Sequence, residues 1–109
     1  MTEEYQNHTP PKAVTLTHAA TLGISQDKPI MLDYYKPSMM HQCRLVKTQD
    51  SDTILYKNEC EYTSPLRKVF QVDESADEHD NTKDIICISE NSVYIVHSNI
   101  LQNTAGEDN

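Results

Sequence analysis

The sequence predicts an all-β protein: a small antiparallel barrel or sandwich of about five to seven short strands, with disordered or extended termini. Three observations lead to this fold class. Two apolar runs at 85–88 and 93–96 flank a short polar break. Further strand-length runs recur at spacings of roughly 8 to 12 residues between turn signals. No long stretch carries a convincing helical pattern.

The two apolar runs predict a hairpin that is apolar on both faces. Strand side chains alternate between faces, and Glu90-Asn91 fits a two-residue turn, although a three-residue loop that uses Ser92 is an alternative. The two-residue turn pairs Ile88 with Val93 and Ile86 with Ile95 on one face, and Cys87 with Tyr94 and Ile85 with Val96 on the other. Since neither face is polar, we expect other layers of the protein to cover both.

The remaining strands are predicted from shorter apolar runs. Residues 29–35 form a strand that ends at Lys36-Pro37-Ser38, because proline cannot sit in a central ladder. Residues 41–48 and 53–58 form a second hairpin around the polar turn at 49–52, and a further strand at 67–72 follows the break at Thr63-Ser64-Pro65.

The segment 13–24 fits two structures. Val14, Leu16 and His18 alternate with threonines, as in a strand, whereas Ala13, Leu16, Ala20 and Gly23 recur at roughly helical spacing. We favour a strand at 13–18, with Gly23 marking a turn.

The chain is predicted to hold one domain. Residues 1–12 are a polar N-terminal arm, 13–100 a single β-rich domain with an acidic loop at 73–84, and 101–109 a polar tail. The formal net charge is −8, yet the segment 28–68 has seven basic and five acidic residues. The arm, loop and tail carry the acidity, which makes nucleic acid a less favoured partner without excluding it.

Cysteine usage and the N-terminus indicate a reducing, cytoplasmic or otherwise intracellular location. Three cysteines give no sensible disulfide framework, and the start lacks the apolar run of a signal peptide. The longest apolar runs are far shorter than a membrane span, so we expect no membrane partner.

The sequence has no motif that predicts catalytic residues, a metal site or a cofactor. The acidic loop lacks the glycine and glutamate positions of an EF-hand, since Thr82 and Ile88 occupy them when Asp77 is the first position. His41, Cys43, Cys60 and Cys87 supply zinc-ligand types without a Cys-x-x-Cys knuckle. With two glycines in the chain, there is no glycine-rich phosphate-binding loop. We therefore expect no enzyme.

Surface recognition is the favoured function class. Tyrosine and arginine are enriched at protein interfaces, and adjacent tyrosines on a strand would place at least one near the surface. Tyr62 adds a further aromatic side chain. The predicted binding residues are Tyr34, Tyr35, Arg44, Tyr56, Arg67 and Lys68. We expect a protein-binding module or component of a larger complex, with a protein partner or a second copy. The alternative is a small barrel that binds single-stranded nucleic acid by stacking bases on tyrosines.

Overall fold

The computed structural model describes residues 10–72 and 83–101. These residues form seven strands and two helices, so the chain is built mostly of strands but is not all-β. The elements in chain order are α2 (Ala13–Gln26), β1 (Ile30–Met31), α3 (Tyr35–Met39), β2 (Arg44–Lys47), β3 (Thr53–Asn58), β4 (Glu61–Tyr62), β5 (Leu66–Val72), β6 (Asp84–Ser89) and β7 (Val93–His97).

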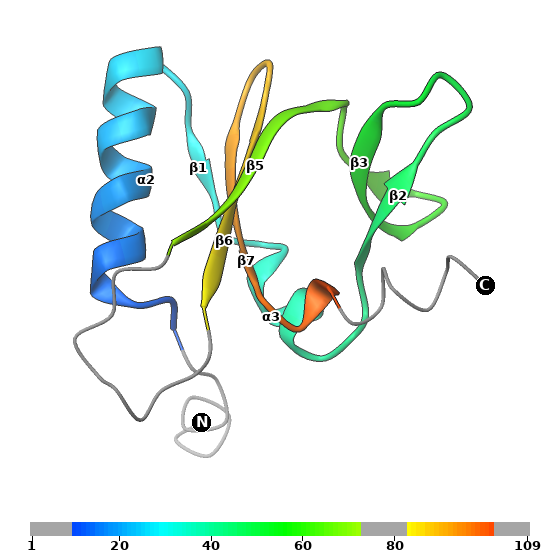
Figure 1. Ribbon diagram of the computed structural model, residues 1–109, viewed down its shortest axis with the longest axis horizontal. Coiled ribbons are helices and arrows are strands. Elements are labelled where there is room, and N and C mark those ends of the chain that lie inside the picture. Colours follow the sequence, from blue (N-terminus) through cyan, green and yellow to red (C-terminus); the bar gives the residue numbers. More distant parts are fainter. Residues whose placement is uncertain (1–9, 73–82, 102–109) are drawn as a thin grey trace.

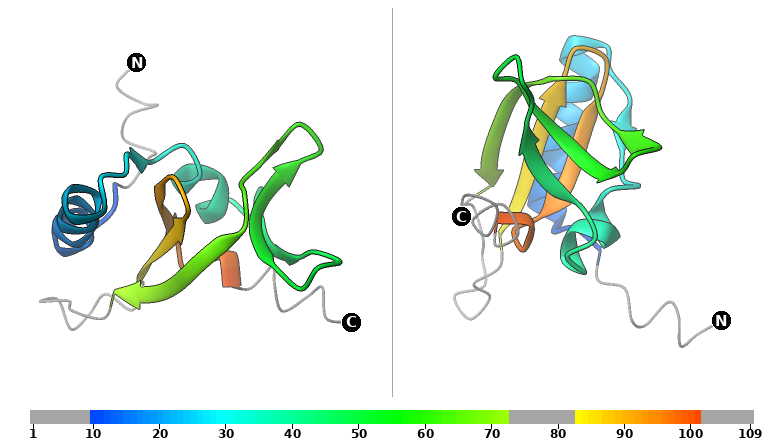
Figure 2. Two further views of the ribbon diagram at one scale, coloured as in Figure 1. Left: turned by 90° about the horizontal axis from the view of Figure 1, so that it is seen from above. Right: turned by 90° about the vertical axis from the view of Figure 1, so that its right-hand side faces the viewer.

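The elements stack in three layers (Figures 1 and 2). The middle layer is a four-stranded sheet in the order β1-β7-β6-β5. Helix α2 packs on one face of this sheet, and a three-stranded sheet in the order β2-β3-β4 packs on the other. Neither sheet closes on itself, so the predicted barrel is wrong. The expectation of purely antiparallel pairing is also wrong, because β1 runs parallel to β7.

The predicted β6–β7 hairpin is confirmed with its register. Ile88 pairs with Val93, and Ile86 pairs with Ile95. Neither turn residue, Glu90 or Asn91, has a positive φ, so the turn is not of type I′. The Ser89 hydroxyl instead accepts a hydrogen bond from the Ser92 backbone N–H at 3.1 Å. This bond joins the two ends of the turn without requiring a glycine.

Both faces of this hairpin are buried, as its continuous apolarity predicted. On the helix side, Ile86, Ile88, Val93 and Ile95 pack with Ala19 of α2. On the other side, Ile85, Cys87 and Val96 of the hairpin pack against Leu55 of β3 and against Cys43, which immediately precedes β2. The hairpin is therefore the centre of the protein, and each outer layer is attached to one of its faces.

Helix α2 replaces the strand that we favoured at 13–18. Its buried residues are Thr15 and Ala19, which lie one helical turn apart, whereas Leu16 is exposed. Gly23 lies inside the helix and not in a turn. A Cβ atom at this position would come within 2.9 Å of the Lys28 carbonyl oxygen, so the close return of the chain after α2 requires a glycine.

A buried carboxylate fastens the start of α2 to the central sheet. Asp84 is 2% exposed and accepts hydrogen bonds from the Lys12 backbone N–H at 2.8 Å, the Thr15 hydroxyl at 2.7 Å and the Tyr35 hydroxyl at 2.7 Å. Lys12 is the N-cap residue and provides no side-chain cap. Asp84 therefore takes the role of a capping group from a distant part of the chain. Its place in β6 corrects the predicted end of the acidic loop, of which residues 73–82 lie outside the described residues.

The strand predicted at 29–35 is shorter than expected. Only Ile30–Met31 is β structure, and helix α3 begins at Tyr35. Pro37 lies in the first turn of α3, where a missing N–H costs little because the first N–H groups of a helix have no partner within it. The predicted hairpin of β2 and β3 and the strand β5 are confirmed, with Leu45 opposite Leu55.

Candidate functional site

The outer face of the β2-β3-β4 sheet carries a row of cationic and aromatic side chains. Leu45 and Leu55 pair across β2 and β3 and point into the core, so their sequence neighbours Arg44 and Tyr56 point the opposite way. Arg44 pairs with Tyr56, and Tyr56 pairs in turn with Tyr62 of β4. The register thus places one residue from each strand side by side, and we call Arg44, Tyr56 and Tyr62 the Arg-Tyr row.

The side chains of the Arg-Tyr row are stacked on one another. The guanidinium carbon of Arg44 lies 5.7 Å from the centre of the Tyr56 ring, within the range of a cation–π contact. The Tyr56 and Tyr62 rings lie 6.3 Å apart and are nearly parallel, with 15° between their planes. Each side chain therefore restricts the rotamers that are open to the next.

The row is accessible. Tyr62 is 58% exposed and Arg44 is exposed, while Tyr56 is half-buried between them. The next pair on the same face, Val46 and Ile54, is half-buried and apolar. Since tyrosine and arginine beside apolar side chains form the centres of many interfaces, this face has the composition of a contact surface.

Lys57 connects this sheet to the buried Tyr34. Its ammonium lies 4.5 Å from the centre of the Tyr34 ring and 3.4 Å from a carboxylate oxygen of Glu61. Burial, followed by the negative charge of Asp33, raises the pKa of Tyr34 to about 12. The Tyr34 phenol therefore stays neutral at physiological pH and serves as a packed aromatic support for Lys57.

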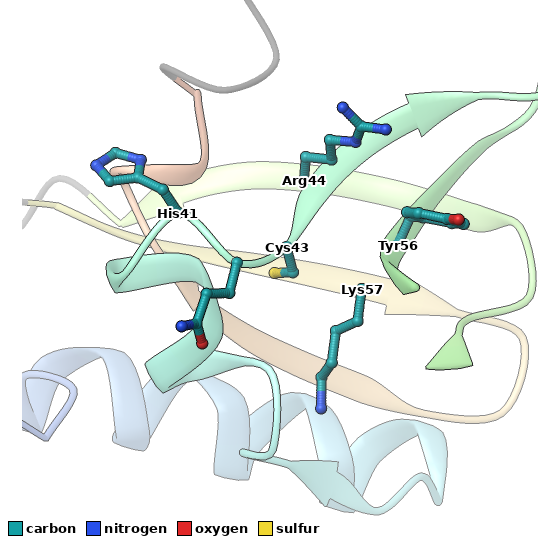
Figure 3. A pocket seen from close by; sticks show the side chains of 6 residues that line it. His41, Cys43, Arg44, Tyr56 and Lys57 are labelled. Atoms are coloured by element: carbon teal, nitrogen blue, oxygen red, sulfur yellow. The ribbon is translucent and has the colours of Figure 1, made fainter. Parts of the chain in front are cut away.

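A cavity of about 290 Å³ lies beside the start of β2 (Figure 3). Among the described residues, no acidic side chain lines this cavity. Figure 3 shows the side chains of Arg44 and Lys57 pointing in different directions, so the two cations do not converge on one anion. Burial raises the pKa of the Cys43 thiol to about 11. This thiol is protonated at neutral pH and is a poor nucleophile. The remaining lining residues are His41, Gln42 and Tyr56.

The structure brings together only some of the predicted binding residues. Arg44 and Tyr56 meet in the Arg-Tyr row, and Tyr34 lies under Lys57. The expectation that Tyr34 or Tyr35 lies near the surface is wrong, because both are buried. The reason is that α3 starts at Tyr35, so the two side chains enter the two cores on opposite sides of the central sheet.

Arg67 and Lys68 lie on β5, in the other sheet, and are exposed. The six predicted residues omit Tyr62, the most exposed tyrosine of the row. The signal that could have found it is the polar stretch Asn58-Glu59-Cys60, which reverses the chain after β3 and places Tyr62 beside Tyr56.

The described residues contain no group of three or more His, Cys, Asp or Glu side chains that could hold a metal ion. Cys43, Cys60 and Cys87 are all free thiols. Within residues 10–72 and 83–101, no helix has the length and apolarity needed to cross a bilayer. No protein-family model, curated protein or solved structure matches this chain.

Proposed function

We propose that the protein is a non-enzymatic module that binds another protein through the outer face of the β2-β3-β4 sheet. The Arg-Tyr row is the centre of the contact, and Val46 and Ile54 extend it. In this role the protein serves as a small component of a larger assembly.

The observation that carries this proposal is the in-register stacking of Arg44, Tyr56 and Tyr62 on a solvent-facing sheet. Binding normally costs the entropy of ordering side chains at the interface. Here the neighbouring rings already restrict one another, so less order has to be gained when a partner arrives. Exposed aromatic and arginine side chains with this arrangement are the residue types in which binding energy concentrates.

The distribution of charge supports a protein partner over nucleic acid. All nine Lys and Arg residues lie in the described part of the chain, together with only eight of the seventeen Asp and Glu residues. The described part is therefore close to neutral. Proteins that bind nucleic acid rely on a clear excess of positive charge along the binding face.

Binding to single-stranded nucleic acid is the second candidate, because the exposed Tyr62 ring beside Arg44 could stack a base. A salt titration separates the candidates. A nucleic-acid function predicts binding of an oligothymidine probe at low salt that weakens steeply as salt rises. Absence of measurable binding at low salt removes this candidate and leaves the protein-binding proposal in place.

The test of the protein-binding proposal is quantitative capture from the source cells with three forms of the chain. Tyr62→Ala removes the exposed ring of the row. Ile24→Ala is the matched control, because Ile24 is 83% exposed on α2, in the layer farthest from the row. Circular dichroism first establishes that all three forms fold alike. Any partner identified is then purified, and its dissociation constant is measured for each form.

We expect the same partner on the wild type and on Ile24→Ala, with Tyr62→Ala binding more weakly by roughly 2 kcal/mol, which is the scale of an interface hot spot. Arg44→Ala, measured as a fourth form once it is shown to fold, should weaken the complex as well. A partner that binds Tyr62→Ala and Arg44→Ala as tightly as the wild type would show that the row is not the contact surface.

A further inference from the structure

Strand β5 forms an open edge of the central sheet. It pairs with β6 on one side only and stands last in the strand order, as Figures 1 and 2 show. With seven residues it is much longer than β1, the two-residue strand at the opposite edge. Long edge strands are uncommon in isolated proteins, because their unpaired peptide groups can bind further strands.

The backbone of β5 is suited to accept another strand. A register shift lies between Leu66 and Lys68, and from there to Val72 the pairing with β6 is regular. In an antiparallel strand, every second residue turns its N–H and C=O away from the partner strand. Among the described residues, none makes a hydrogen bond to the backbone of β5 from the open side.

The side chains of β5 indicate the charge of a suitable partner. Arg67 and Lys68 are exposed, Val69 is 40% exposed, and the strand contains no acidic residue. Arg67 contacts Glu90 at 3.1 Å in a solvent-exposed pair, which is a weak interaction. No acidic side chain of the described residues pairs with Lys68.

We propose that the β5 edge binds an extended, acidic segment of a partner protein as an additional strand. The peptide backbone of that segment would supply the affinity, and glutamate or aspartate side chains opposite Lys68 and Arg67 would supply the selectivity. Arg67 and Lys68 would repel a basic strand. Because β5 contains no acidic residue, the β5 strand of a second copy would also offer these two cations no acidic partner. This surface is independent of the Arg-Tyr row, which lies on the other sheet.

The experiment is an NMR titration of the full chain with three synthetic peptides. The first alternates glutamate with valine. The second has the same side chains but N-methyl groups on alternate peptide bonds, which removes strand-forming N–H groups. The third has lysine in place of glutamate. We expect only the first peptide to shift the backbone amide signals of 66–72 and to slow their hydrogen exchange.

Two charge reversals provide the matched comparison. Lys68→Glu should weaken binding of the glutamate peptide about threefold to tenfold, which is the range for replacing an attractive cross-strand pair by a repulsive one. Lys47→Glu, at an exposed position at the end of β2 in the other sheet, should leave that affinity unchanged. Tyr62→Ala should also leave it unchanged, so failure of this inference is distinguishable from failure of the proposed function.

Several results would overturn the inference. One is equal binding of the N-methylated peptide, since strand addition requires the missing N–H groups. Another is a set of shifted signals confined to β2, β3 and β4. Absence of any shifted signal at millimolar peptide would also overturn the inference. Self-association through 66–72 without peptide would overturn it too, because the strand bound at the β5 edge would then belong to a second copy of the chain.

Discussion

Removal of the buried Asp84 carboxylate should destabilise the protein severely. Asp84→Ala deprives three donors of their acceptor. The Lys12 N–H is only partly buried and can turn to water, but the hydroxyls of Thr15 and Tyr35 lie in the core. A hydrogen bond to a charged group contributes about 1.5–3 kcal/mol. Two such bonds give an expected loss of about 3–6 kcal/mol, a large part of the roughly 5–15 kcal/mol that stabilises a domain.

Asp84→Asn sharpens this prediction because it preserves the size of the side chain. The amide oxygen can accept from the Lys12 N–H and the Thr15 hydroxyl, as one carboxylate oxygen does, while the NH₂ group would face the Tyr35 hydroxyl, which has to rotate to accept a hydrogen bond from it. We therefore expect a loss smaller than that of Asp84→Ala. Urea denaturation followed by circular dichroism measures the free energy of unfolding of each variant.

A double-mutant cycle with Tyr35→Phe isolates the hydrogen bond from the general loss of packing. On its own, Tyr35→Phe should cost about 1.5–3 kcal/mol, because the buried carboxylate loses a donor. In the Asp84→Ala background it should cost less, since the hydrogen bond between the two side chains is already absent. Additive effects, with a coupling energy below about 0.5 kcal/mol, would refute the hydrogen bond between Tyr35 of α3 and Asp84 of β6.

Three further predictions concern the buried thiols and the hairpin. An alkylating reagent at neutral pH should label Cys60 alone in the folded protein, because Cys60 is exposed and the other two thiols are buried. Burial also raises the pKa of Cys43 to about 11 and the pKa of Cys87 to about 12, so both thiols stay protonated. Rapid labelling of all three cysteines, detected by mass spectrometry, would contradict this prediction. In the unfolded chain the thiols of Cys43 and Cys87 ionise with a pKa of about 9.0, below their pKa in the folded protein. Their contribution to stability is therefore complete below pH 9.0 and is lost as the pH rises toward 12. Urea denaturation at several pH values tests this prediction. Ile86→Asp should abolish the cooperative unfolding transition, because it buries an unpaired charge. Val69→Asp, at the open edge of the sheet, should change the free energy of unfolding by less than about 1 kcal/mol. Equal effects of the two substitutions would mean that the hairpin is not the core.

The central hairpin could be predicted from sequence because its signal is local. Each strand is continuously apolar, which indicates that both faces are buried, and the two-residue turn at Glu90-Asn91 gives the register. The same reasoning identified β2, β3 and β5, whose polar turns and proline breaks are also local.

Helix α2 and the buried tyrosines could not be predicted in this way, because distant residues determine them. The helix has a weakly apolar face, with Thr15 as one of its buried residues, and Thr15 is accommodated by Asp84 from β6. Alternation of Val14 and Leu16 therefore resembled a strand. Tyr34 was expected on a strand, and only the start of α3 at the next residue turns it inward. The Arg-Tyr row depends on the β3–β4 pairing, whose short second strand gives little sequence signal.

Native-state hydrogen exchange tests most directly whether the β6–β7 hairpin is the doubly covered centre of the protein. With layers on both faces, the hydrogen-bonded amides of 85–88 and 93–96 should exchange only when the whole protein unfolds. Their exchange free energies should then agree with one another and with the free energy from urea denaturation. Exchange of either strand through a local opening that costs at least about 2 kcal/mol less than global unfolding would contradict the arrangement.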